Sequence, residues 1–217
     1  SRGAGDSKGR QESIMKILVV ADVESKALWE FYEQNRHTSP DLILSCGDLD
    51  ADYLSFLTTM YHCDVLYVHG NHDNDYEKNP PEGCICIDDD LINYNGIRIL
   101  GLGGSMKYNL GRYQYSEKQM RRRYWRLWTK IQRYRGFDIL LTHAPAKGLH
   151  DGKDMPHRGF QCFLDMIERY KPRYFVHGHV HMNYGYGMVR KDHYRQTIVV
   201  NAYEKYSIEY EKSLDKS

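Results

Sequence analysis

YFVHGHVH, at residues 174–181, joins a short apolar run to a cluster of imidazoles. The run has the length and the residue types of a buried strand, and Gly178 gives the backbone freedom to turn so that His179 and His181 point in different directions. The same layout, an apolar run that ends in polar side chains, occurs at four other places. These clusters are Asp22 with Glu24, Gly47-Asp48, Gly70-Asn71-His72-Asp73, and Thr142-His143. The repetition indicates one site assembled from the ends of several strands.

The apolar runs before these clusters predict a sheet whose strands are mostly parallel. The runs occupy 17–21, 42–46, 65–68, 139–141 and 174–176. Stretches with helical periodicity follow most of them, and strands that alternate with helices form parallel sheets. In open α/β sheets, ligands bind in the crevice outside the carboxyl ends of the strands. We therefore expect the five polar clusters to converge in space.

Capping and periodicity signals predict the remaining elements. Ser116 and Gln119 form a capping box at the start of a helix, and Asn95-Gly96 between two apolar runs is typical of a β-hairpin. Alternating segments late in the chain indicate antiparallel strands that complete a second sheet. The helices are expected at 25–36, 50–61 and 116–135, and the late strands at 184–190, 194–200 and 205–210. Together these elements predict a central β-sandwich flanked by helices.

The balance of charge argues against nucleic acid or a membrane as an obligatory partner. Lys and Arg number 30 against 29 for Asp and Glu, which gives a net charge of +1, so no global field attracts a polyanion. No apolar stretch approaches the ~20 residues that a membrane-spanning helix needs. We expect no membrane partner, and the oligomeric state stays open.

The cysteines and the first residues bear on location and domain organisation. The five cysteines are odd in number and scattered through mostly apolar segments, which favours buried thiols in a reducing cytoplasm over a disulfide framework. Residues 1–14 are polar and glycine-rich, and we expect them to be a disordered extension or an expression remnant. One domain is expected over 15–217, since no linker divides this range.

The residue types in the five clusters suit two divalent metal ions a few ångströms apart. Such a pair needs a carboxylate to bridge it, and neutral imidazoles and oxygen donors to complete each shell. Asp48 is the natural bridge. One ion would take Asp22, Glu24 and His181, and the other Asn71, His143 and His179. A water bound between two such ions loses a proton near neutral pH and can attack phosphorus as hydroxide.

His72 has no metal to bind in this scheme. An imidazole beside the ions can protonate the leaving-group oxygen or stabilise the phosphoryl charge, a role worth about 10² to 10⁴ in rate. The carboxylate that orients it could be Asp50, Asp52 or Asp73. We therefore expect His72 to be catalytic, with Asp50 and Asp73 as its candidate partners.

Two basic regions are candidates for binding phosphate. His157 and Arg158 follow His143 in a polar loop and could contact a substrate phosphate together with Asn71; an ordinary polar loop is an equal alternative. The basic helix at 116–135 suits nucleic acid, or else it is a solvated face whose arginine stems pack on the core. Its basic residues include Arg121, Arg122, Arg123, Arg126, Lys130, Arg133 and Arg135.

Taken in order, these motifs resemble the calcineurin-like metallophosphoesterase superfamily, and among it the small bacterial-type phosphodiesterases and phosphatases. The family pattern is Asp-x-His, Gly-Asp, Gly-Asn-His-Asp/Glu, a lone His, and Gly-His-x-His, and the resemblance covers residues 15 to about 205. It implies a four-layer α/β/β/α sandwich that hydrolyses phosphomonoesters, phosphodiesters or pyrophosphates. It also implies two divalent ions, for which we expect manganese, with iron, zinc or nickel as alternatives.

The resemblance assigns roles to residues whose motifs match. It implies that the ligands are Asp22, Asp48, Asn71, His143, His179 and His181, and that His72 is the catalytic histidine. Glu24 stands where the family usually has histidine, and a glutamate favours harder ions such as manganese. Ala51 stands where some members have the aspartate that orients the catalytic histidine, so the neighbouring Asp50 or Asp52 would have to replace it.

The sequence thus predicts a cytoplasmic, metal-dependent phosphoesterase. A metal-bridging hydroxide would attack phosphorus while His72 assists the leaving group, and phosphodiester hydrolysis is favoured because an alkoxide gains most from a positioned acid. A nucleotide or a nucleic-acid diester would suit the arginine-rich helix. The alternatives are a phosphomonoesterase and a catalytically inactive metal-binding scaffold for protein interaction. A scaffold has no need to retain His72, whereas Glu24 points towards one.

Overall fold

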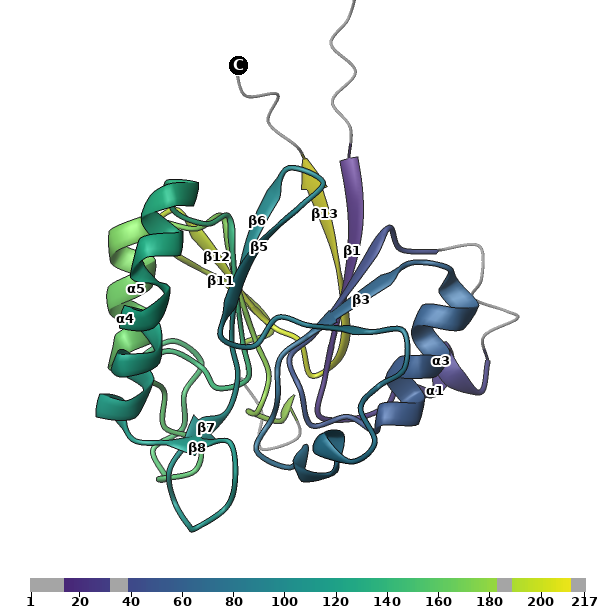
Figure 1. Ribbon diagram of the computed structural model, residues 1–217, viewed down its shortest axis with the longest axis horizontal. Coiled ribbons are helices and arrows are strands. Elements are labelled where there is room, and N and C mark those ends of the chain that lie inside the picture. The colour runs from purple at the N-terminus through teal and green to yellow at the C-terminus, as the bar shows by residue number, and fades with distance from the viewer. Residues whose placement is uncertain (1–13, 32–38, 183–188, 212–217) are drawn as a thin grey trace, which may run out of the picture.

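Two β-sheets pack face to face in the computed structural model, and helices cover the outer face of each sheet (Figure 1). The structure describes residues 14–31, 39–182 and 189–211. The first sheet contains, in spatial order, β13 (Glu204–Glu211), β1 (Ile14–Ala21), β2 (Leu42–Ser45), β3 (Asp64–Tyr67) and β4 (Ile85–Cys86). The second contains β11 (Lys191–Tyr194), β12 (Thr197–Asn201), β10 (Tyr174–His177), β9 (Ile139–Thr142), β6 (Ile97–Leu102) and β5 (Asp90–Tyr94).

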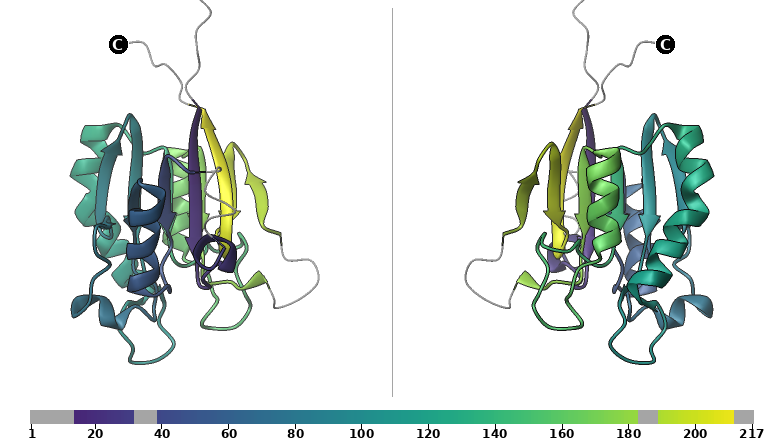
Figure 2. Two further views of the ribbon diagram at one scale, coloured as in Figure 1. Left: turned by 90° about the vertical axis from the view of Figure 1, so that its right-hand side faces the viewer. Right: turned by 90° about the vertical axis from the view of Figure 1, so that its left-hand side faces the viewer.

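The helices lie on opposite sides of this pair of sheets (Figure 2). The first sheet is covered by α1 (Lys26–Trp29) and α3 (Ala51–Tyr61), and the second by α4 (Glu117–Tyr134) and α5 (Gln161–Tyr170). Short elements in the connections are the 3-10 helix η2 (Asn74–Glu77) and the paired strands β7 (Ser105–Met106) and β8 (Gln114–Tyr115). The predicted four-layer α/β/β/α sandwich is confirmed.

Most strand pairs are parallel, as predicted, and the antiparallel strands lie at three edges. β1 to β4 run parallel, as do β12, β10, β9 and β6. One prediction was wrong, because the segment 205–210 was expected in the second sheet. As β13 it instead pairs with β1 in the first sheet, with Ile208 opposite Ile17. Both strands have eight residues, so the pairing satisfies the whole free edge of β1; alternation in the sequence does not identify such a partner.

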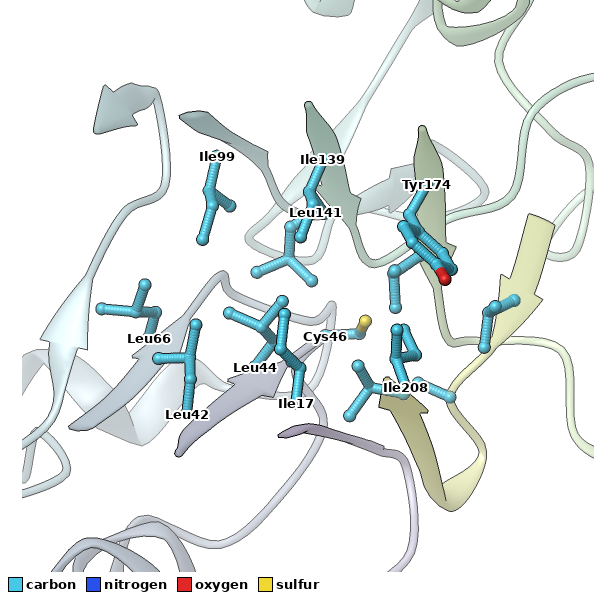
Figure 3. Close-up of a cluster of buried hydrophobic side chains, with 14 of the residues drawn as sticks. Ile17, Leu42, Leu44, Cys46, Leu66, Ile99, Ile139, Leu141, Tyr174 and Ile208 are labelled. Carbon is cyan, nitrogen blue, oxygen red and sulfur yellow. The ribbon is translucent and has the colours of Figure 1, made fainter. Parts of the chain in front are cut away.

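Apolar side chains from the facing sides of the two sheets form the central core (Figure 3). Ile17, Leu42 and Leu44 come from the first sheet and Ile139 and Leu141 from the second, and each is at most 1% exposed. Two further apolar clusters fill the space between each sheet and its helices. Strands buried on both faces need continuous apolar runs, which is the pattern of the sequence. The packing fixes the ends of the strands relative to one another.

Local signals located the helices with unequal success. Asp50 caps α3 by accepting from the Asp52 N–H at 2.8 Å, and the capping box of Ser116 and Gln119 opens α4 as predicted.

Other predicted elements differ from the structure or lie outside the described residues. The helix expected at 25–36 is α1 over 26–29, and 32–38 lie outside the described residues. The strand expected at 184–190 falls mostly outside them too, and α5 was not predicted. No helix within the described ranges is long and apolar enough to cross a membrane.

One arginine of α4 is a buried cation. Arg123 is 5% exposed and donates to Asp88, to Asp89 and to the carbonyl of Gly103, each at 2.7 Å. Burial would raise the pKa of Asp88, but the hydrogen bond from His69 and the charge of Arg123 outweigh it and hold that pKa at about 2. The network therefore ties α4 to the loops that follow β4 and β6, and through His69 to the loop that follows β3.

Other basic residues of α4 also have acidic partners. Arg121 pairs with Asp165 of α5 at 2.8 Å, and Lys130 pairs with Asp90 of β5. These pairs use part of the helix's basic charge to attach it to its neighbours, in keeping with the packing alternative.

Replacing Arg123 with methionine should leave the Asp88 carboxylate buried without its cation and destabilise the protein by about 3 to 5 kcal/mol. Urea unfolding measures the change. Arg122→Met, at an exposed position of the same helix, is the matched control and should cost less than about 0.5 kcal/mol. Asp88 stabilises the fold above its unfolded pKa of ~4, and this contribution is lost as the pH falls through about 2. Equal stabilities of the two variants would contradict this role of Arg123.

Candidate metal centre

The polar clusters lie together where parallel strands of both sheets end, at the lower edge of the molecule in Figure 1. Asp22 follows β1, Asp48 follows β2 and Asn71 follows β3, whereas His143 and His179 follow β9 and β10 of the second sheet. The carboxyl ends of strands from both sheets therefore contribute ligand types to one site, as parallel topology predicts.

Four acceptor atoms converge on one point. The Nε2 atom of His143 lies 3.0 Å from the Oδ1 atom of Asn71, 3.0 Å from the Nδ1 atom of His179 and 3.4 Å from the Oδ2 atom of Asp48. Asp48, His143 and His179 form a group whose ligand atoms lie within 4.8 Å of one another. Asn71, His143 and His179 are buried, so little water competes for these atoms.

When both imidazoles are neutral, as metal binding requires, the hydrogens of these side chains point away from the shared space. His143 Nδ1 lies 2.8 Å from the carbonyl oxygen of Cys46 and His179 Nε2 lies 2.7 Å from that of Pro156, and each nitrogen donates to it. A neutral imidazole has one N–H, so the nitrogens that face each other carry lone pairs. Lone pairs at 3.0 Å repel unless a cation lies between them. The donor set of imidazole nitrogens, carboxylate and amide oxygen therefore fits a divalent metal ion.

The pKa values within the centre reflect the same crowding. Burial would lower the pKa of His143, but the charge of Asp48 outweighs it and raises that pKa to about 9. Burial and the charge of His143 lower the pKa of His179 to about 3. Burial raises the pKa of Asp22 to about 7. Without an ion, His143 thus keeps a second proton at neutral pH, and a bound ion would take the place of that proton.

The ligands expected for the other ion are less tightly gathered. Both carboxylate oxygens of Asp22 accept from the backbone N–H of His179, at 2.9 and 3.0 Å. His181 Nε2 lies 4.0 Å from Asp22 Oδ1. Glu24 lies mostly exposed on the segment after β1, where the partial burial of its carboxyl group and the nearby charge of Asp50 raise its pKa. A ligand role for Glu24 stays a prediction.

Three of the proposed ligands have left-handed backbone conformations. The φ angles are 65° at Asp22, 57° at Asp48 and 67° at His179. Such conformations cost about 1 to 3 kcal/mol each and persist at functional sites where the surroundings enforce them. They turn the chain sharply after the strand, which brings the side chain back over the strand end.

Glycines before the ligands allow a close approach of two loops. Gly47 has a φ of 93°, and a Cβ atom there would lie 2.1 Å from the nitrogen of Gly70. A Cβ atom on Gly70 would lie 2.0 Å from Asp48 Oδ1. The Gly-Asp and Gly-Asn-His-Asp motifs therefore owe their glycines to contact between the loops after β2 and β3.

His72 stands at the rim of the centre. Its backbone N–H donates to Asp48 Oδ1 at 2.7 Å, while its side chain is 71% exposed with Nε2 4.0 Å from Asp48 Oδ2. A cavity of about 390 Å³ adjoins it. Its polar lining, besides His72 and Asp48, consists of Asp50, Asp52, Asp73, Asp75, Tyr76 and Asn79.

The carboxylates expected to orient His72 have backbone partners. Asp50 caps α3. Asp73 is 4% exposed and accepts from the N–H groups of Gly70 at 2.6 Å and Asp48 at 3.0 Å, so it joins the loops that contribute the metal ligands. An orienting role for Asp50 or Asp73 stays a prediction.

The two residues expected to bind substrate phosphate lie apart. The His157 ring packs 5.1 Å from that of His179, and its Nδ1 atom pairs with Asp154 at 2.6 Å. Arg158 is exposed and lines a different cavity, with Lys147 and Lys153. His157 thus adjoins the centre, and substrate contact by either residue stays a prediction.

Sequence reasoning missed one side chain at the centre. Tyr108 lies in the loop between β7 and β8, and its hydroxyl accepts from the Nδ2 atom of Asn71 at 3.2 Å. The loop belongs to no motif of the five clusters, and tyrosine occurs 19 times in the chain, so the sequence offered no signal for this contact.

Comparison with known proteins gives one family. A family model described as calcineurin-like phosphoesterase matches residues 15–183. UPF0046 protein T07D4.2 of Caenorhabditis elegans is 32% identical over 110 residues, which are 50% of this chain and 26% of that protein. The chain thus spans about a quarter of that relative's length.

Solved structures share the fold. The protein TT1561 of Thermus thermophilus has a TM-score of 0.60 at 18% identity, over 88% of this chain and 90% of that one. A putative 5'-nucleotidase from Staphylococcus aureus, solved with alpha-ketoglutarate, has a TM-score of 0.50 at 13% identity, over 87% of this chain and 48% of that one. At such identities the likeness concerns the fold alone.

Metal binding should release a proton and strengthen as the pH rises. His143 is protonated below a pH of about 9 in the metal-free protein because of its raised pKa, and an imidazole must lose that proton to bind an ion. The affinity for Mn²⁺ should therefore rise by roughly tenfold per pH unit between about pH 6 and pH 8. Titration followed by the electron paramagnetic resonance of free Mn²⁺ measures it. An affinity that stays constant over this range would contradict a ligand role for His143.

Proposed function

Because this chain belongs to the calcineurin-like phosphoesterase family, we propose that it hydrolyses phosphate esters with two divalent ions at the candidate metal centre. The observation that carries the proposal is the convergence of ligand atoms from Asn71, His143, His179 and Asp48, all of which offer lone pairs once His143 is neutral. Bound ions would lower the pKa of a water and neutralise the phosphoryl oxygens during in-line displacement.

The positions of the ligand residues suggest which of them would bind each ion. The Oδ2 atom of Asp48 lies 3.4 Å from His143 Nε2, and its Oδ1 atom accepts from the His72 N–H. Asp48 would therefore be the bridging carboxylate. Asn71, His143 and His179 would complete one shell. Asp22, His181 and Glu24 would complete the other. Manganese suits this mixture of carboxylates and imidazoles.

His72 would transfer a proton to the leaving group. Its exposed ring stands beside Asp48 and opens on the cavity of about 390 Å³, which has room for the alcohol portion of an ester. An alkoxide is a poor leaving group unless an acid protonates its oxygen, in a monoester as in a diester. We favour phosphodiesters over phosphomonoesters because a diester carries one negative charge where a monoester carries up to two, and the cavity is lined by carboxylates.

The charge of the cavity bears on the substrate. Carboxylates of Asp50, Asp52 and Asp75 line it together with His72, and like charges disfavour a polyanion there. The basic helix α4 already pairs Arg121, Arg123 and Lys130 with acidic side chains. We therefore favour an ester whose leaving group is neutral or positively charged over a nucleic-acid strand.

A metal-binding scaffold without turnover is the second candidate. The looser arrangement of Asp22, His181 and the exposed Glu24 favours it, because an ion held by the other ligands alone could be structural. A cytoplasmic location is part of either proposal, since all five cysteines are free and free thiols are typical of a reducing compartment. Cys46 and Cys162 are buried, whereas Cys63 and Cys84 are partly exposed and Cys86 is exposed, which corrects the expectation that the thiols are buried.

The test compares two phosphodiesters that differ in their leaving groups. His72→Ala should lower kcat by about 10² to 10⁴ for an alkyl ester, and by much less for a p-nitrophenyl ester, whose leaving group needs no proton. Both are measured with Mn²⁺ after confirming equal metal content. His193→Ala, at an exposed histidine of β11, is the matched control and should keep wild-type rates.

Two results would contradict the proposal in different ways. Equal losses of kcat for the two esters would show that His72 is not the general acid, while the proposal that the protein is a hydrolase would stand. An absence of turnover with Mn²⁺, Fe²⁺, Zn²⁺ or Ni²⁺ despite bound metal, for mono- and diesters alike, would favour the scaffold.

A further inference from the structure

One proposed ligand has an orientation that depends on a side chain outside the five clusters. Asn71 is 3% exposed, and its carboxamide lies between two partners. The Oδ1 atom faces His143 Nε2 at 3.0 Å, and the Nδ2 atom donates to the hydroxyl of Tyr108 at 3.2 Å. His143 and His179, in contrast, donate to backbone carbonyl oxygens. The hydrogen-bond partner of Asn71 on the side away from the ion is therefore a side chain, Tyr108, which a substitution can remove without altering the backbone.

The two ends of a carboxamide are not equivalent for metal binding. Its oxygen binds hard cations, whereas its NH₂ group has two hydrogens and no lone pair to offer. A half-turn of the Asn71 amide would place these hydrogens in the space shared with His143. Resting on the proposed metal centre, we infer that Tyr108 is a positioning residue: by accepting from Nδ2, it keeps Oδ1 of Asn71 directed at the ion.

The loop that carries Tyr108 is held in place from both ends. The Oε1 atom of Gln114 accepts from the backbone N–H groups of Tyr108 at 3.2 Å and Asn109 at 3.1 Å. The Tyr113 ring stacks on His69, with centroids 4.3 Å apart and planes 7° apart. His69 belongs to the network of Asp88 and the buried Arg123 described above. The phenol of Tyr108 therefore reaches Asn71 from a loop whose backbone is fixed.

Loss of the hydroxyl would affect Asn71 more than the fold. Tyr108 is 37% exposed, so Tyr108→Phe leaves the ring in place and opens no space in the core. A buried N–H without an acceptor costs free energy. In Tyr108→Phe, the Nδ2 group of Asn71 bears this cost when Oδ1 faces the ion, so that orientation becomes less favourable. Outer partners of metal ligands typically contribute 10- to 100-fold, in round numbers, to metal affinity.

The experiment measures Mn²⁺ affinity by the electron paramagnetic resonance of the free ion, without reference to turnover. Tyr108→Phe should weaken the ion bound by Asn71 by about 10- to 100-fold. Tyr113→Phe, which removes a hydroxyl from the same loop and keeps the ring that stacks on His69, should stay within about twofold. Circular dichroism confirms that each variant is folded.

A second pair of variants separates orientation from a general effect of the loop. An aspartate at position 71 presents an oxygen whichever way it turns, so in an Asn71→Asp background the further change Tyr108→Phe should alter affinity by less than about threefold. Equal weakening in both backgrounds would overturn the positioning role, as would an unchanged affinity in the Asn71 background. A wild-type chain that binds no Mn²⁺ would overturn it together with the proposed function. Metal binding without turnover would overturn only the hydrolase.

Discussion

The Nε2 atom of His143 and the Nδ1 atom of His179 face each other at 3.0 Å in a buried space, and much of the surrounding structure serves to hold them there. Each ring is fixed by the hydrogen that it donates to a backbone carbonyl, so neither can turn its N–H inward without losing that bond. The same outward placement of donors occurs at Asn71. Two nitrogens placed in this way need a positive charge between them, either the second proton of His143 or a metal ion, so metal binding displaces that proton.

The site is shaped by backbone features at the strand ends, and the packed core keeps those strand ends in place. Left-handed residues at Asp22, Asp48 and His179 turn the chain at the strand ends, and glycines let the loops after β2 and β3 approach closely. Each of these features costs stability by itself. The apolar core between the sheets offsets that cost and sets the distance between their ends. The buried pair of Arg123 and Asp88 then attaches α4 to the segment after β4. His69 also bonds Asp88 and stacks on Tyr113, which links the loop of Tyr108 to the same network.

Features that depend on neighbours in sequence could be predicted, and those that depend on distant partners could not. The strand-end motifs, the capping box at Ser116 and the hairpin at Asn95-Gly96 have local signals, and the structure has the elements they predict. The pairing of β13 with β1 depends on which edge is free. In the sequence, Arg123 looks like the other basic residues of its run, and only the packed helix shows that its side chain is buried. The contact of Tyr108 with Asn71 depends on two loops that are distant in sequence.

Anomalous scattering from crystals grown with Mn²⁺ would test the centre most directly. Two peaks about 3.5 to 4 Å apart, on either side of the Asp48 carboxylate, with one of them bound by His143 Nε2 and His179 Nδ1, are the result expected of a dinuclear centre. A map without a peak among Asp48, His143 and His179, in crystals that hold Mn²⁺ elsewhere, would contradict it.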